Sequence, residues 1–69
     1  MVYFVDVRKT LHYIEFHEAE VPFHEVFNQI SKCKNPRKKG EIFVIENDKY
    51  YIVYRITNNI AFVINAKRK

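Results

Sequence analysis

Arg55 is set apart by its position among apolar residues. It is the only charged residue in the run from Tyr50 to Ile56, and strand alternation places it on the same face as Tyr51 and Val53. A guanidinium on a sheet face can hold a phosphate, and a tyrosine beside it can stack on a nucleic-acid base. The alternatives are an ion pair or a solvated edge for Arg55, and sheet packing for Tyr51.

The basic residues of the chain are unevenly distributed. Residues 1–30 carry two Lys or Arg against five Asp or Glu, and residues 31–69 carry ten against three, which gives the net charge of +4. Grouped basic residues bind polyanions by neutralising phosphates, and the alternative is a solvated loop and tail. Together with Tyr51, the residues expected to contact nucleic acid are Lys32, Lys34, Arg37, Lys38, Lys39 and Lys69.

Three histidines and one cysteine complete the residues with potential chemistry. We expect no metal site, because residues 11–16 are read as a strand, which turns His12 and His17 to opposite faces. Cys33 is a lone thiol and is interpreted as a plain small side chain. With Gly40 as its only glycine, the chain has no glycine-rich phosphate loop, so we expect no cofactor.

The elements that must position these residues follow from hydrophobic periodicity. Phe23, Val26, Phe27 and Ile30 form one stripe of a helix over residues 21–34, which Pro36 ends. Strands are predicted at 2–7, 11–16, 42–46, 50–56 and 60–66, with residues 8–10, 47–48 and 57–59 as turns. For the first two strands the alternative is one long bent strand. The predicted fold is α+β with the order ββαβββ, one helix packed on an antiparallel sheet of about five strands.

This sheet is expected to be apolar on both faces, and one helix covers only one of them. We therefore expect a homodimer or higher oligomer, with a closed barrel as the competing arrangement. The contact is expected to centre on one of two sets, Tyr51, Val53 and Phe43, or Tyr50, Ile52 and Ile42.

Length and composition limit the class of protein. The 69 residues are expected to form a single domain, 1–69, that holds together without disulfides, because there is one cysteine. A lone cysteine favours a reducing compartment, so we expect a cytoplasmic protein. No apolar run approaches the roughly 18 residues of a membrane span, so no membrane role is expected.

Two short segments resemble the RelE/BrnT-like toxin group, small basic proteins that cut messenger RNA, often on the ribosome. Residues 20–27, EVPFHEVF, are similar to the "V-S-F-E-E" helix start of the group, and residues 64–69, INAKRK, to its "I-S-A-R-K" ending. The resemblance covers residues 20–69, and two predicted strands replace the usual helical N-terminal region. It implies an antitoxin partner and, as catalytic cations, Arg55, Lys67 and Arg68.

Cleavage of RNA by its own 2′-hydroxyl also needs a base and an acid. The candidate bases are His24, Glu46 and Tyr54, and the sequence does not choose between them. Our leading hypothesis is a small basic intracellular protein that binds nucleic acid or the ribosome, with an RNA-cleaving RelE/BrnT-like toxin as its sharper form. The alternative is a non-catalytic, self-associating protein-interaction domain, and whether the chain is an enzyme stays open.

Overall fold

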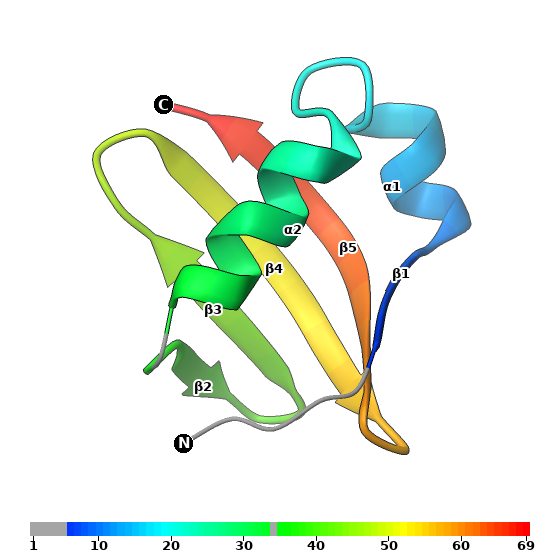
Figure 1. The fold of residues 1–69 in the computed structure, drawn as a ribbon, viewed down its shortest axis with the longest axis vertical. Helices are drawn as coiled ribbons and strands as arrows, with labels where there is room; N and C mark the ends of the chain where they lie inside the picture. The colour runs from blue at the N-terminus through cyan, green and yellow to red at the C-terminus, as the bar shows by residue number, and fades with distance from the viewer. Residues whose placement is uncertain (1–5, 34) are drawn as a thin grey trace.

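In the part of the chain that the structure describes, a five-stranded mixed sheet carries two helices (Figure 1). The computed structural model describes residues 6–33 and 35–69. In chain order the elements are β1 (Asp6–Lys9), α1 (Leu11–Phe16), α2 (Phe23–Lys32), β2 (Arg37–Lys39), β3 (Ile42–Glu46), β4 (Tyr50–Thr57) and β5 (Ile60–Arg68). The α+β class is confirmed, whereas the order ββαβββ is not.

The strands lie in the order β1-β5-β4-β3-β2. β2, β3, β4 and β5 pair antiparallel, as predicted for the last three, and β1 pairs parallel to β5. The sheet is therefore mixed, because β1 enters beside the last strand of the chain instead of forming a hairpin.

The second helix is shorter than predicted. α2 begins after Pro22, whose φ of −58° suits a helix start, and Cys33 caps its end. Val26 and Ile30 are buried, but Phe27 is 46% exposed, so the apolar stripe is narrower than its sequence spacing indicates. Lys34 lies outside the described residues.

The strand predicted over 11–16 is wrong, because these residues form α1. Thr10 caps this helix, since its hydroxyl oxygen accepts a hydrogen bond from the Tyr13 backbone N–H at 3.3 Å. The segment suggested a strand because it is rich in apolar and aromatic residues and follows residues read as a turn, but a single inward residue, Tyr13, anchors a six-residue helix.

The turn predicted at residues 8–10 is also wrong, because β1 runs through Arg8 and Lys9. Of the strand predicted over 2–7, residues 2–5 lie outside the described part of the chain. Three consecutive basic residues predicted as loop, 37–39, form the edge strand β2. Their pairing with β3 supplies the backbone hydrogen bonds that such a polar segment needs.

Tight turns join the last strands. Gly40 has a φ of +62°, and Asn58 and Asn59 have φ values of 51° and 62°. The left-handed region favours Gly and tolerates Asn, which agrees with the turn predicted between β4 and β5.

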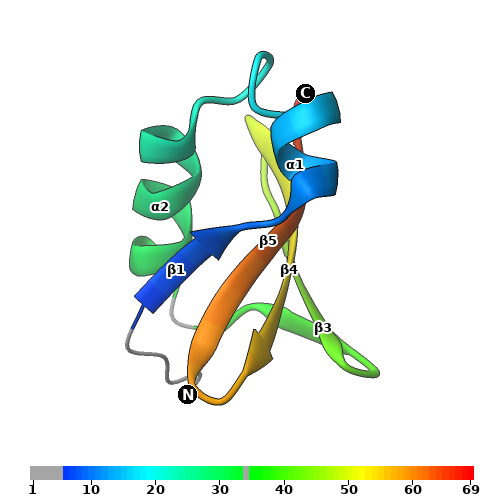
Figure 2. The same ribbon diagram turned by 90° about the vertical axis from the view of Figure 1, so that its right-hand side faces the viewer.

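The core lies between α2 and one face of the sheet, and α1 closes one end of it (Figures 1 and 2). Tyr13 is fully buried there, packs edge-on against Phe23 and donates a hydrogen bond from its hydroxyl to the Val21 carbonyl at 2.6 Å. The sheet contributes Val7, Ile45, Ile52, Tyr54, Ala61, Val63 and Ala66.

The opposite face, here called the open face, is turned away from α2 in Figure 2. Val44 and Val53 are direct cross-strand partners on this face and are only 4% and 6% exposed. The long side chains around them thus cover the centre of the face within one chain, which weakens the argument for a dimer through a bare sheet. Ile42, not Phe43, shares this face with Val53, so each expected contact set contains one residue from the wrong face.

We predict that Tyr13→Phe lowers the free energy of unfolding by about 1–3 kcal/mol, because it leaves the buried Val21 carbonyl unpaired. Burial raises the pKa of Tyr13 to about 12. A raised folded-state pKa stabilises the fold below the ordinary value of about 10, and this contribution is lost as pH rises through 12. Urea titrations between pH 8 and 11 should show a steeper alkaline loss in the unmodified chain than in Tyr13→Phe.

Tyr51→Phe, on the open face, is the matched control. Equal losses in the two variants would contradict the assigned role of the buried hydroxyl.

Candidate nucleic-acid interface

A row of side chains crosses all five strands on the open face. The strand register aligns Arg8 of β1 with Phe62 of β5, Phe62 with Arg55 of β4, and Arg55 with Ile42 of β3. Ile42 in turn faces Lys39 of β2. Directly opposed residues project from the same face, so cations and apolar side chains alternate along this line. We call these five residues the cationic row.

The three cations of the row are exposed, while Phe62 and Ile42 are half-buried. Neighbouring strands lie about 4.8 Å apart, so Arg55 stands roughly 10 Å from each of the outer cations. Positive charges at this spacing, separated by apolar surface, form an elongated site suited to a flexible polyanion.

Two further rows lie parallel to the cationic row. The nearer consists of Arg37, Val44, Val53 and Asn65, and the farther of Glu46, Tyr51 and Lys67. The side-chain oxygen Oδ1 of Asn65 is buried and has no hydrogen-bond partner among the described residues. A β-bulge at Val53/Tyr54 shifts the register beside this residue. The centre of the open face therefore offers one polar acceptor without a donor.

Ion pairs neutralise only part of this face. Glu46 lies 3.0 Å from the Arg37 guanidinium and 2.7 Å from Lys69 Nζ, and the hydrogen bond from Lys69 holds the pKa of that carboxyl below its usual range. Arg8 lies 3.2 Å from Asp6. Among the ion pairs of residues 6–33 and 35–69, none contains Arg55, Lys39 or Lys67. The uncompensated charge thus lies at the middle and the β2 end of the row and on Lys67.

Arg68 points away from the other predicted catalytic cations. Its guanidinium lies 2.8 Å from Glu25 of α2, its Nε donates to the Glu20 carbonyl at 3.0 Å, and its charge lies over the Tyr50 ring. The Tyr50 hydroxyl also donates to Glu25. This cluster, on the helix side, ties the end of β5 to the start of α2.

Other predicted residues likewise lie away from the open face. His24 and Lys32 are exposed on α2, and Lys38 reaches over the Phe43 ring on the helix side. Tyr54 is 1% exposed, stacks on Phe43, and its pKa is raised to about 12 by burial. The structure therefore brings together Arg55, Lys67, Arg37, Lys39, Tyr51 and Glu46, and Lys69 joins them through Glu46.

Arg8 and Phe62 were not predicted as site residues. Arg8 looked like part of a turn, and Phe62 like a packing residue of a hairpin. The antiparallel pairing of β4 with β5 places Phe62 beside Arg55, and the parallel pairing of β1 with β5 then adds Arg8 to the row. Strand alternation within the predicted hairpin could have identified Phe62. Identifying Arg8 also requires the parallel pairing of β1 with β5, which no local sequence pattern indicates.

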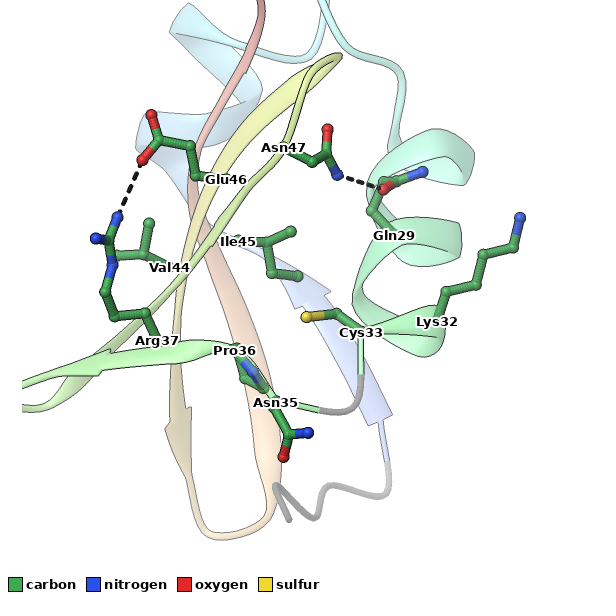
Figure 3. A pocket seen from close by; sticks show the side chains of 10 residues that line it. All are labelled: Gln29, Lys32, Cys33, Asn35, Pro36, Arg37, Val44, Ile45, Glu46 and Asn47. Atoms are coloured by element: carbon green, nitrogen blue, oxygen red, sulfur yellow. Dashed lines mark hydrogen bonds and ion pairs between the residues drawn. The ribbon is translucent and has the colours of Figure 1, made fainter.

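A separate pocket of about 530 Å³ lies between the end of α2 and β3 (Figure 3). In Figure 3 the Cys33 thiol points toward Ile45, and Asn47 donates a hydrogen bond to Gln29 at 3.2 Å across the rim. β2 pairs with β3 only from Ile42 to Val44, so the edge beside the pocket is not covered by β2. This hollow opens at the sheet edge and is distinct from the cationic row.

Within residues 6–33 and 35–69, no three His, Cys, Asp or Glu side chains gather in a group that could hold a metal ion. In the same ranges, no helix is long and apolar enough to cross a membrane.

Comparison with known proteins gives one informative likeness. No protein-family model matches the chain, and no curated protein matches it in sequence. Its structure is similar to a chain in the crystal structure of the toxin-antitoxin complex RelBE2 from Mycobacterium tuberculosis, with a TM-score of 0.62 and 14% identity. The match covers 100% of this chain and 94% of that one. At this identity the likeness concerns the fold, and it extends over the N-terminal region, where the sequence resemblance did not.

We predict that Glu25→Gln reduces the loss of unfolding free energy that occurs as the pH falls from 7 to 2. The hydrogen bond from Tyr50, and then that from Arg68, lowers the pKa of Glu25. A lowered folded-state pKa stabilises the fold above the ordinary carboxyl value of about 4.3, and this contribution is lost as pH falls through the folded value. Urea unfolding between pH 7 and 2 should therefore show the variant less stable at pH 7 and equal to the unmodified chain at the acid end.

Glu15→Gln, on the exposed surface of α1, serves as the control. The same reduction in both variants would show that general charge, not this cluster, causes the loss of unfolding free energy at low pH.

Proposed function

We propose that this chain is a small RNA-binding protein of the toxin-antitoxin kind that takes single-stranded RNA across its open face. The cationic row carries this proposal, because three cations alternate with two apolar side chains along a line across the whole sheet. The fold likeness to a chain of the RelBE2 toxin-antitoxin complex supports the class of protein.

The chemistry of the row fits a single strand better than a duplex. Arg8 and Arg55 flank Phe62, so a base stacked on the ring would have a guanidinium on each side for its phosphates. Tyr51, two residues along β4 from Val53, adds a second aromatic surface. Such contacts tolerate any base, so we infer recognition of the RNA backbone rather than of a sequence.

For RNA cleavage, Arg55 is the residue we assign to the charge that develops on the phosphate. Lys67 is a second cation on the same face, and Glu46 is the carboxylate of that face. Glu46 is paired with Arg37 and Lys69, so it would act as a base only after RNA displaced these partners. His24, Arg68 and Tyr54 lie on the helix side, so we assign them no part in this step.

The partners follow from the same surface. We propose that RNA or the ribosome is the ligand, and that an antitoxin protein inhibits it by presenting carboxylates to the cationic row. A self-associating form would bury the exposed apolar side chains of the helices, of which Leu11 at 76% and Phe16 at 66% are the most exposed. A homodimer through α1 would thus leave the open face accessible.

The two neighbouring lysines of β2 test the face that is used. Lys39 projects from the open face and Lys38 from the helix side, and both are exposed. We predict that Lys39→Ala lowers the salt dependence of RNA binding by roughly 0.7 in slope, as expected for one lost contact to a single strand, whereas Lys38→Ala leaves it unchanged. Fluorescence anisotropy of a labelled RNA 20-mer from 50 to 300 mM salt measures both slopes.

Equal effects of the two substitutions would indicate a diffuse basic surface. In that case the cationic row would not be the binding site.

Arg55→Ala tests function against fold. We predict that it abolishes RNA cleavage or growth arrest on expression in a bacterial host, while the free energy of unfolding changes by less than about 1 kcal/mol, because the side chain is exposed and unpaired among the described residues. Lys32→Ala, which removes an equal charge from the helix side, should keep full activity. An unfolded Arg55→Ala variant, or one with undiminished activity, would refute the assignment.

A further inference from the structure

His12 and His17 face each other although they are five residues apart. The strand predicted for this segment would have turned them to opposite sides, but α1 carries His12 and ends at His17. His17 has left the helical conformation, with φ −129° and ψ −25°, and its Nε2 lies 3.2 Å from the Nε2 of His12.

The two Nε2 atoms point toward a common position beside both rings, and the rings are not collinear. Their centroids are 5.0 Å apart and their planes are inclined by 50°. At this nitrogen separation, two rings aligned head-on along an N–H···N bond would place their centroids about 5.5 Å apart. Two imidazole nitrogens on one tetrahedral zinc ion, each at about 2.0–2.1 Å, lie about 3.3 Å apart. The observed distances between the two Nε2 atoms and between the two ring centroids therefore fit two histidines bound to one zinc ion.

We propose that His12 and His17 form a binding site for a divalent transition-metal ion of intermediate softness, with Zn²⁺ as the reference ion. Imidazole nitrogen suits Zn²⁺, Ni²⁺ and Cu²⁺ and suits Mg²⁺ and Ca²⁺ poorly. Because no third protein ligand stands by within the described residues, water or a small anion completes the coordination. The site is thus open and exchangeable, not a closed structural centre.

Both ligands are held in place before an ion arrives. His17 is 8% exposed, and its backbone N–H donates to the Tyr13 carbonyl at 2.9 Å. The ring of His12 packs against Phe16 with centroids 5.1 Å apart. Without an ion, one Nε2 must donate a hydrogen to the other, so metal binding requires both rings to carry their hydrogen on Nδ1. This change in tautomer provides a readout that is independent of affinity.

The test is a Zn²⁺ titration of the full, tag-free chain at pH 7.5, followed by calorimetry and by ¹H–¹⁵N spectra of the imidazole rings. We expect one equivalent of Zn²⁺ to bind, with the ring signals of His12 and His17 moving to the metal-bound Nε2 pattern and those of His24 unchanged. His24, exposed on α2, is the matched control, and His24→Ala should bind as the unmodified chain does.

His12→Ala should lose this binding, and because His12 is exposed the variant should keep the fold. His12→Gln offers His17 a hydrogen-bonding partner but is a poor zinc ligand, and it should also fail to bind. Absence of saturable binding by the unmodified chain, or binding retained by both His12 variants, would overturn the proposal. Mg²⁺ in place of Zn²⁺ should leave the imidazole signals of all three histidines unchanged. If Mg²⁺ shifted the signals of His12 and His17 as Zn²⁺ does, the binding would be nonspecific and the proposal would be overturned.

Discussion

Thr10 joins β1 to α1, and its hydrogen bonds link Arg8 of the cationic row and the histidine pair of α1 to the rest of the sheet. Its hydroxyl donates to the Val63 carbonyl of β5 at 2.7 Å, and the hydroxyl oxygen accepts from the Tyr13 backbone N–H. One side chain thus fixes the end of β1 against the neighbouring strand β5 and starts α1. This junction extends the β1–β5 pairing that holds Arg8 beside Phe62, and it starts the helix that carries Tyr13 into the core.

The alternation of β4 and β5 separates structural charge from charge available to a ligand. On the helix side, Arg68 is surrounded by Glu20, Glu25 and Tyr50, so its charge stabilises the junction of β5 with α2. On the open face, Arg55 has no such carboxylate neighbour among the described ion pairs. Two arginines thirteen residues apart in the same hairpin therefore have different tasks, because strand alternation and one bulge turn them to opposite faces.

Much of the C-terminal half could be predicted from the sequence, and less of the N-terminal half. Residues 42–46, 50–56 and 60–66 are β-branched and aromatic runs separated by Asn and Asp, so local preference and tertiary structure agree there. Residues 11–16 are rich in apolar and aromatic side chains, as in a strand, and the Thr10 cap and the burial of Tyr13 make them a helix. β2 is wholly basic and has no local strand signal, so it forms because β3 offers it hydrogen bonds. The candidate site was predicted as far as Arg55, Lys39, Arg37, Lys67 and Tyr51. The predicted hairpin of β4 and β5 already placed Phe62 beside Arg55, whereas the position of Arg8 depended on the parallel pairing of β1 with β5.

The composition of β2 also affects how copies of this protein meet one another. β2 is the last strand of the sheet, and a free strand edge is a template on which a second chain can add its own strand. All three residues of this edge are basic and exposed, so two molecules that approached edge to edge would bring six like charges together. These side chains therefore protect the sheet from growing into a fibre. A polyanion that neutralised these three side chains would remove this protection and leave the edge free to pair.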